Sequence, residues 1–492
     1  MSPQRKLLLL GTFVHSKTQQ TLDIFHSAGI AVDARGKIAA IERDAPDLGE
    51  AKARLLTKLG WDEAEVDVTQ AADGQFFFPG FIDTHIHAPQ YANAGIFGKS
   101  SLLDWLETYT FPLEASLADL AKARRVYARC IRRTLSHGTT TATYFATLDV
   151  AATNLLADLC LSMGQRAFVG RVCMDRAETS PAYYRDASAE ASLEATRRTI
   201  EHVRRIDPGF DVVSPILTPR FAPSCTREVM AGLARIHRET GLPIQTHVSE
   251  NAGEIQLVAR LFPEASSYTD VYRRLGLLTP RTVLAHAVHL SEDEADAIAG
   301  QGAKVSHCPC SNTSLTSGAA RVRWMWDKGI DVGLGTDVSG GYSPSILEAA
   351  RQAAMVSRHV AMNIQIPPDD DAAAAEEKTK EKERVKLTVE EVLYLATRGG
   401  AKCVGLEDKV GAFEVGMEWD AQLVALSNVN DDGELPDDAA AANDDDGGDD
   451  DGFVDVFGWE SWGDRVAKWL YNGDDRNTKK VWVKGRLVHR RR

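Results

Sequence analysis

The chain has 492 residues and a formal net charge of -14, with 44% hydrophobic and 26% charged residues. This balance is ordinary for a soluble globular protein and excludes a fibre or a wholly disordered chain. The negative charge argues against nucleic acid as a partner, because nucleic-acid binding favours basic surface. The chain is too long for one small core, yet a barrel of eight strand-helix units commonly uses about 250 residues or more. We therefore expect one large domain and one smaller domain.

The start of the chain and its cysteines indicate the compartment. Residues 1–10 lack the longer apolar core and the cleavage site of a signal peptide. No run approaches the roughly 18 apolar residues that a membrane-spanning helix needs. The seven cysteines are odd in number and scattered, which is typical of reduced thiols. We expect a cytoplasmic protein without a membrane partner.

Short apolar runs separated by turns occupy both ends of the chain. Residues 6–44 read as β-hairpins without helical periodicity, and residues 45–70 are charged and read as helix or loop. Residues 420–426 and 481–488 are further short strands. We predict that the two ends meet in one small β-sandwich domain, built from residues 1–75 and 403–492.

Between these ends, residues 76–402 alternate strand-like runs with longer amphipathic segments. Eight runs, each followed by a segment of helical length, predict a (β/α)8 TIM-type barrel in the α/β class. The strand-like runs are residues 77–87, 139–146, 166–173, 212–219, 243–248, 282–286, 304–308 and 330–337. The clearest helices are residues 117–136, 227–240 and 344–359.

Three charged segments have plain structural explanations. Residues 429–452 are almost wholly Asp, Gly and Ala, and residues 368–385 are rich in Asp, Ala, Lys and Glu. We expect the first to be a disordered surface insertion. The basic residues between 122 and 133 are spaced as on the outer face of a helix, which favours a solvated face over a nucleic-acid site.

His85 and His87 stand two residues apart at the end of an apolar run. In a strand this spacing puts both imidazoles on one face. Neutral imidazole is a preferred ligand of zinc, so the pair suits a metal site at the mouth of a barrel. For the spacing alone, two histidines in polar surface explain the pattern equally well.

The other polar residues at expected strand ends strengthen the metal interpretation. In a barrel of this type, active residues lie at the C-terminal ends of the strands. Besides the histidine pair, these ends carry Arg220 and Phe221, His247, Glu250, His286 and Asp337. Three imidazoles and a carboxylate can hold one zinc and leave a place for water, whose pKa the ion would lower toward about 7. Asp337 suits the role of ligand and proton acceptor, and Glu250 suits that of a proton carrier.

Each of these residues also has a simpler explanation. His247 or His286 alone is more often a hydrogen-bonded core or surface histidine. Asp337 is compatible with a strand-end turn, and Glu250 with the first turn of a helix. Arg220 is compatible with a surface ion pair, and Phe221 with the core. Together, however, they favour a metal site, because the alternative requires every placement to be accidental.

Several segments carry a resemblance to a known family. From the run Phe78-Pro79-Gly80-Phe81-Ile82-Asp83-Thr84-His85-Ile86-His87, the chain resembles the amidohydrolase superfamily. The following Ala88-Pro89-Gln90-Tyr91 narrows the resemblance to the guanine deaminase family. Further matching segments are residues 103–112, 138–147, 165–170, 218–221, 333–342 and 473–477.

This resemblance implies an activity, a metal and roles for the residues. The activity is hydrolysis of guanine to xanthine and ammonia, and family members are commonly homodimers. One zinc ion would be held by His85, His87, His247 and Asp337. Catalysis would use Glu250, Asp337 and His286, with His286 beside the reacting water. The substrate would contact His87, Gln90, Arg220, Phe221, His247, Glu250 and Asp337.

One position departs from the family pattern. Where the family has His-Cys-Pro-Asn-Ser-Asn, this chain has His307-Cys308-Pro309-Cys310-Ser311-Asn312. If that asparagine supports the pocket, Cys310 would change binding strength or substrate range. Two closely spaced thiols without a second pair do not predict a structural zinc site, so we assign this segment to packing at the barrel end.

Two other functions remain open from the sequence. A related barrel hydrolase would act on another aminated heterocycle, such as a pterin, a triazine or an adenine-like base. A catalytically silent scaffold would keep the fold for assembly, with the acidic insert as a docking segment.

Overall fold

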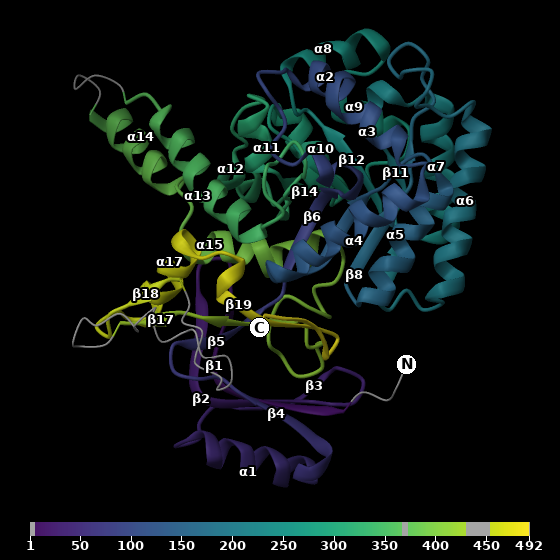
Figure 1. Cartoon of the computed structure of the whole chain (residues 1–492). Helices are drawn as coiled ribbons and strands as arrows, with labels where there is room; N and C mark the ends of the chain where they lie inside the picture. The colour runs from purple at the N-terminus through teal and green to yellow at the C-terminus, as the bar shows by residue number, and fades with distance from the viewer. Residues whose placement is uncertain (1–4, 367–371, 430–452, 492) are drawn as a thin grey trace.

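The computed structural model describes residues 5–366, 372–429 and 453–491. The described chain has mixed α/β content, with a sheet from both ends of the chain below a larger helical and parallel-stranded part in Figure 1. Almost all of the acidic insert predicted at 429–452 lies outside the described residues. Within the described ranges, none of the helices combines the length and the apolar character that crossing a membrane requires.

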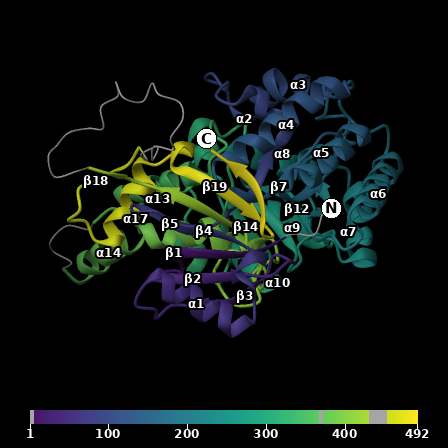
Figure 2. The same cartoon turned by 60° about the horizontal axis from the view of Figure 1, so that its bottom comes forward.

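Both ends of the chain contribute to one eight-stranded sheet, whose strands lie side by side in Figure 2. Its order is β20-β19-β16-β5-β1-β2-β3, and β4 pairs with β1. The C-terminal β16 lies antiparallel to the N-terminal β5. The predicted meeting of the two ends is confirmed as this sheet, whereas the β-sandwich stays a prediction. The strands are β1 Lys6–Ser16, β2 Leu22–Val32, β3 Ile38–Glu42, β4 Val66–Gln70, β5 Gln75–Pro79, β16 Ala421–Ala425, β19 Thr478–Val483 and β20 Arg486–Arg490.

Close packing accounts for a register shift in this sheet, and capping residues account for the ends of the helix beside it. The pairing of β1 with β2 shifts register after Gly11, where a Cβ atom would lie 2.6 Å from Cβ of Ala71. Within the charged stretch 45–70, helix α1 (Leu48–Leu59) begins at the side-chain cap of Asp47 and ends at the left-handed Gly60.

The larger part contains two four-stranded parallel sheets, ordered β10-β8-β7-β6 and β12-β13-β14-β15. β9 and β11, which follow β8 and β10 in the chain, form a short parallel pair, and a parallel bridge joins Leu217 to Ile244 at the start of β12. Each of the eight predicted runs contains a strand, which confirms them. The strands are β6 Phe81–His87, β7 Thr139–Phe145, β8 Arg166–Gly170, β9 Val172–Cys173, β10 Val213–Pro215, β11 Thr218–Pro219, β12 Ile244–Val248, β13 Thr282–His286, β14 Lys304–His307 and β15 Val332–Leu334.

The first predicted run divides at Gly80. The part before it, β5, belongs to the terminal sheet, and the part after it, β6, begins the parallel strands. A Cβ at Gly80 would lie 2.2 Å from the side chain of Thr140, so only glycine allows the two backbones to approach here.

The first and last parallel strands are joined by hydrogen bonds. The hydroxyl of Thr84 donates to the carbonyl of Leu334 at 2.8 Å. The backbone N–H of Asp337 donates to the carbonyl of His85 at 2.8 Å, and that of His87 donates to Val338 at 3.1 Å. These contacts hold β6 beside the segment that follows β15.

The three predicted helices are confirmed, and capping residues explain where two of them begin. The helix predicted at 117–136 begins after its cap Asp119, and the helix predicted at 344–359 begins after its cap Ser345. The α-helices after α1 are α2 Leu102–Trp105, α3 Phe111–Ser116, α4 Leu120–Ser136, α5 Val150–Met163, α6 Ala189–Ile206, α7 Arg227–Thr240, α8 Ala252–Leu261, α9 Tyr268–Arg274, α10 Glu292–Gln301, α11 Pro309–Ser314, α12 Val322–Asp327, α13 Ile346–Met362, α14 Ala372–Arg384, α15 Val389–Tyr394, α16 Gly400–Cys403 and α17 Trp462–Asn472.

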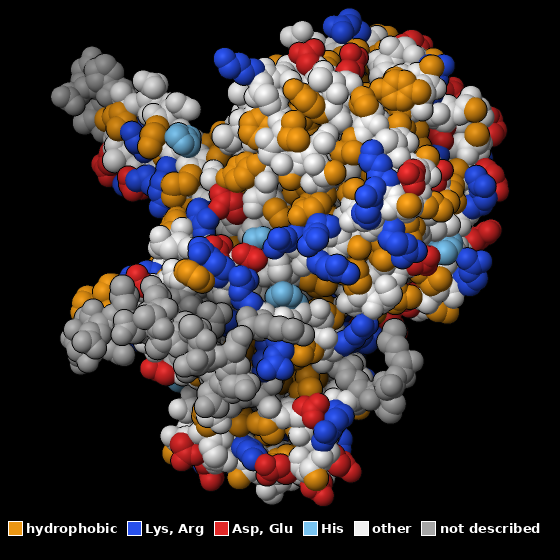
Figure 3. Space-filling view, in the orientation of Figure 1, with side chains coloured by type: hydrophobic (Ala, Val, Ile, Leu, Met, Phe, Trp, Pro, Cys, Tyr) orange, Lys and Arg blue, Asp and Glu red, His pale blue; other side chains and the backbone are white. Residues whose placement is uncertain are grey.

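Helices α4 and α14 account for two of the charged segments. Arg124, Arg125, Arg129 and Arg132 of α4 are exposed, which confirms a solvated basic face. Basic side chains gather across the middle of the face shown in Figure 3, where α4 lies in Figure 1. The described part of the insert at 368–385 forms α14, which projects from the molecule beside α13.

A buried ion cluster connects β8 to the terminal sheet. The guanidinium of Arg166 donates to Glu418 at 2.6 Å and to Asp420 at 3.1 Å, and all three side chains are almost fully buried. Asp420 directly precedes β16, so the cluster ties the start of a parallel strand to a strand of the other sheet.

We expect Arg166→Ala to destabilise the fold by about 3 to 5 kcal/mol, because it leaves two carboxylates buried without their cation. Arg197→Ala removes an exposed ion pair with Glu239 and should cost about 1 kcal/mol or less. Thermal unfolding of both variants checks the difference. Equal stabilities would contradict a structural role for the buried cluster.

Candidate active site

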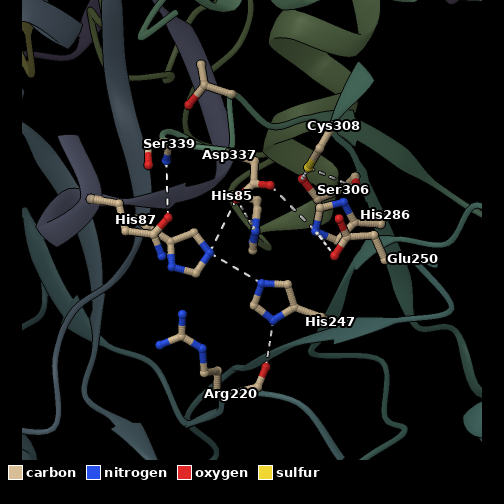
Figure 4. A network of polar contacts seen from close by, with 12 residues as sticks. His85, His87, Arg220, His247, Glu250, His286, Ser306, Cys308, Asp337 and Ser339 are labelled. Atoms are coloured by element: carbon tan, nitrogen blue, oxygen red, sulfur yellow. Dashed lines mark hydrogen bonds and ion pairs between the residues drawn. The ribbon is translucent and has the colours of Figure 1, made fainter. Parts of the chain in front are cut away.

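The structure brings the predicted site residues together at the C-terminal ends of the parallel strands. His85 and His87 lie on β6, His247 on β12 and His286 at the end of β13, while Asp337 follows β15 (Figure 4). All five are buried. The remaining predicted residues come from the loops after these strands or from short helical turns, namely Gln90, Arg220, Phe221 and Glu250.

These residues line one cavity. Of the predicted set, only His85 is not part of its wall. Hydrophobic side chains complete the wall. The lining residues are His87, Gln90, Leu102, Trp105, Leu106, Arg220, Phe221, His247, Glu250, His286, Leu315 and Asp337.

The ring nitrogens converge on the carboxylate of Asp337. Its Oδ1 lies 3.1 Å from Nε2 of His85 and 3.3 Å from Nε2 of His87. Nε2 of His87 is also 3.3 Å from Nε2 of His247. Nε2 of His286 lies 3.7 Å from Oδ2 of Asp337. Four buried imidazoles therefore gather around one carboxylate.

The outer contacts of two histidines fix which ring nitrogen faces inward. Nδ1 of His247 lies 2.6 Å from the carbonyl oxygen of Arg220, and Nδ1 of His286 lies 2.9 Å from Oδ1 of Asn312. Both partners are acceptors, so Nδ1 carries a proton in each ring, and in the neutral form of the ring Nε2 presents a lone pair to the site. Burial lowers the pKa of His247 well below its ordinary value and that of His85 to about 4. Neutral imidazoles, the form that binds metal, are thus favoured.

The donor atoms fit a metal ion better than they fit one another. Nε2 of His85 and of His286 are buried without a hydrogen-bond partner in the described structure. Two groups of ligand atoms lie within 4.8 Å of one another, His85 with His87 and Asp337, and His85 with His247 and His286. Buried polar atoms that lack partners are costly, and a cation between them would satisfy them.

The two carboxylates at the site are held in different protonation states. Burial alone would raise the pKa of Asp337, but the imidazoles of His85 and His87 outweigh it and hold the pKa well below its usual range. Burial, and then the charge of Asp337, raise the pKa of Glu250 well above its usual range. Oε2 of Glu250 lies 3.5 Å from Nε2 of His286. One ionised carboxylate and one protonated carboxyl are the usual requirement for moving protons in opposite directions.

The backbone at the ends of these strands is strained. His286 has φ 74°, Asp337 has φ 47° and Ser249, next to Glu250, has φ 47°. Left-handed backbone at residues other than glycine costs on the order of 1 to 3 kcal/mol and is concentrated at functional sites. These turns aim the side chains into the cavity.

Several residues that shape the site were not found from the sequence. Trp105 and Leu106 form part of the wall and fall within a segment that carried the family resemblance, and Asn312 falls within the motif that contains Cys310. Ser317 donates to Glu250 at 3.4 Å. Glu114 is fully buried behind the cavity, and no motif or spacing identified it, because a glutamate in a short helix reads as surface.

Cys310 is buried but is not part of the cavity wall. It lies on α11, the helix whose Asn312 contacts His286. An effect of Cys310 on the substrate would therefore have to act through α11. The cysteines are free and buried in the described chain.

Known proteins match this chain over most of its length. The profile of the Amidohydrolase family matches residues 76–488. The chain belongs to the amidohydrolase family. A probable guanine deaminase of Schizosaccharomyces pombe is 46% identical over 483 residues, covering 98% of this chain and 83% of that protein. The guanine deaminase of Homo sapiens is 38% identical over 482 residues, covering 97% and 95% of the two chains.

A solved amidohydrolase structure agrees with these relatives. The guanine deaminase of C. acetobutylicum, determined with guanine in its active site, is 31% identical with a TM-score of 0.80. The match covers 98% of this chain and 100% of that chain. The likeness therefore extends over both the parallel strands and the terminal sheet.

We expect a divalent metal to stabilise the protein through the imidazole and carboxylate group. Metal at about 1,000 times its Kd adds about 4 kcal/mol to the free energy of unfolding, and a chelator should remove that gain. His85→Ala should lose the metal-dependent shift in Tm. His202→Ala, which removes an imidazole paired with Asp158 outside the site, should keep it. A metal response retained by His85→Ala would contradict this site.

Proposed function

We propose that the protein is a zinc-dependent guanine deaminase that hydrolyses guanine to xanthine and ammonia. One observation carries the proposal. A buried group of metal ligands, a protonated Glu250 and the polar pair Gln90 and Arg220 line the same cavity, in a chain that matches guanine deaminases over nearly its whole length.

The metal would be held by His85, His87, His247 and Asp337. Nitrogen ligands with one carboxylate suit zinc. When bound, zinc activates water for attack and polarises the group under attack. His286 faces the same point with an unprotonated Nε2 and can hold the attacking water by accepting a hydrogen bond from it.

The carboxyl groups of Asp337 and Glu250 would carry out different proton transfers. The ionised Asp337 accepts a proton from the water as the oxygen adds to the carbon that bears the exocyclic amine. The protonated Glu250 gives its proton to the adjacent ring nitrogen, which receives the electron pair displaced by the attack. The proton held by Asp337 then passes to the amine, the C–N bond breaks and ammonia leaves. The proton of the added hydroxyl returns to Glu250 as the carbonyl of xanthine forms.

The purine would be oriented by polar and aromatic side chains that line the same cavity as the zinc ligands. The amide of Gln90 and the guanidinium of Arg220 present polar edges to the heterocycle, and the ring of Phe221 covers its face. Leu102, Trp105 and Leu106 exclude water from the remaining side.

The proposal extends to the architecture and setting of the enzyme. The two parallel sheets would form one (β/α)8 barrel, supported by the hydrogen bonds between β6 and the segment after β15. Residues 76–402 would form the catalytic domain, with 1–75 and 403–492 in the smaller one. The enzyme would act as a homodimer in the cytoplasm, consistent with free, buried cysteines.

Purified protein should convert guanine to xanthine, lose this activity to a chelator and regain it with zinc. Xanthine formation is followed by absorbance and zinc by elemental analysis, with about one zinc expected per chain. A panel of pterin, triazine and adenine-like amines tests the alternative substrates. Folded, zinc-loaded protein that is inert toward guanine would overturn the proposal, and turnover of another amine would redirect it.

Glu250→Gln should reduce kcat by about 100- to 10,000-fold, because the amide cannot donate and recover a proton. Zinc content and thermal stability should stay near those of the wild type. Glu294→Gln is a matched control, since Glu294 is a buried capping glutamate of α10 outside the cavity, and it should retain activity. Normal turnover by Glu250→Gln would exclude Glu250 as the proton carrier.

A further inference from the structure

Glu114 is fully buried and makes four hydrogen bonds from outside the cavity. It lies on α3 (Phe111–Ser116), directly after the π-helical segment Leu106–Thr110. Its Oε1 accepts from Gln90 at 2.7 Å and from Arg220 at 3.1 Å. Its Oε2 accepts from Arg220 at 2.6 Å and from Tyr184 at 2.7 Å. The carboxylate therefore accepts hydrogen bonds from both Gln90 and Arg220, which line the cavity.

We propose that Glu114 is a positioning residue that makes the cavity selective for a neutral purine over an anionic one. The inference rests on the proposed function and deepens it. Glu114 fixes the orientation of Gln90 and Arg220, and its charge balances the guanidinium beside the ligand.

The orientation of Gln90 follows from its two partners. A carboxylate only accepts, so the amide nitrogen of Gln90 faces Glu114, and Oε1 accepts from the backbone N–H of Ser339 at 3.2 Å. The amide can no longer flip. One N–H and one lone pair remain, a donor and an acceptor in fixed places, which suits the edge of a neutral heterocycle that has both.

The charge of Arg220 is balanced before any ligand arrives. The bidentate pair with Glu114 uses one N–H from each terminal nitrogen, and both side chains are almost fully buried. Burial alone would raise the pKa of Glu114, but Arg220 holds it below its usual range. An unbalanced buried guanidinium would attract an anion strongly. Paired with Glu114, it offers its remaining N–H groups as donors without a net charge.

This balance matters because substrate and product differ in acidity. Guanine is neutral near neutral pH, whereas xanthine is the stronger acid and loses a ring proton in that range. Because the ion pair of Arg220 and Glu114 has no net charge, it favours the uncharged substrate and weakens retention of the anionic product. Without Glu114, the ionised product would bind more tightly and inhibit turnover.

The test compares the zinc-loaded wild type with Glu114→Gln, Glu114→Asp and Tyr184→Phe. Glu418→Gln is the matched control, because it breaks another buried pair with an arginine at the N-terminal start of β8, away from the cavity. Two kinds of measurement are made for each protein. They are kcat and KM for guanine, and calorimetric binding of hypoxanthine, a neutral unreactive analogue, and of xanthine below and above its pKa.

Glu114→Gln should raise KM and the Kd for hypoxanthine by about 10- to 100-fold, through loss of charge-assisted hydrogen bonds. Its affinity for xanthine relative to hypoxanthine should rise above the pKa of xanthine. Glu114→Asp and Tyr184→Phe keep the charge, so they should raise KM without changing the preference for a neutral ligand. They also keep the test valid if Glu114→Gln fails to fold.

Other results would overturn the inference. One is folded Glu114→Gln that prefers hypoxanthine over ionised xanthine as strongly as the wild type does. A second is the same altered preference in Glu418→Gln. A third is loss of the preference in both Glu114→Asp and Tyr184→Phe. Failure of the proposed function is seen separately, as wild-type protein that binds hypoxanthine but forms no xanthine from guanine. Wild type that binds neither purine would overturn both.

Discussion

The site depends on one constraint, namely that the carboxylate of Asp337 must be held among buried imidazoles from three different strands. An ionised carboxylate without a partner would be expensive in this environment. The cost is offset only while β6, β12, β13 and the turn after β15 stay in register. The hydrogen bonds from Asp337 to His85 and from His87 to Val338 fix two of these segments directly. The strained backbone at His286 and Asp337 is part of the same requirement.

Another part of the cavity wall follows a similar rule with different groups. There the guanidinium of Arg220 is balanced by Glu114, which also holds Gln90 and Tyr184. The charge of Arg220 is thus matched within the protein. The raised pKa of Glu250 favours its uncharged, protonated form. A site organised in this way can hold an uncharged heterocycle and still offer a proton, a proton acceptor and fixed hydrogen-bond donors.

Much of the fold could be predicted because apolar runs and turns are local features of the chain. All eight predicted runs contain strands, and the three clearest helices are present within a few residues of their expected ends. The differences have identifiable causes. Asp119 and Ser345 begin their helices later than the apolar pattern suggested, since capping depends on side-chain contacts. Gly80 divides one run between two sheets because Thr140 packs against it, and that neighbour comes from a distant strand.

The sequence by itself determined the candidate metal ligands and the candidate proton carrier, because metal chemistry needs particular side chains at strand ends and these are visible as residue types. It also determined the family resemblance through the segment that contains His85 and His87. Only the tertiary structure revealed Glu114, Tyr184 and Asn312 as partners of the site. Their roles depend on contacts between residues far apart in the chain, such as Glu114 with Arg220. Neither the composition nor the periodicity of the sequence predicts which buried charged residues will form ion pairs with one another.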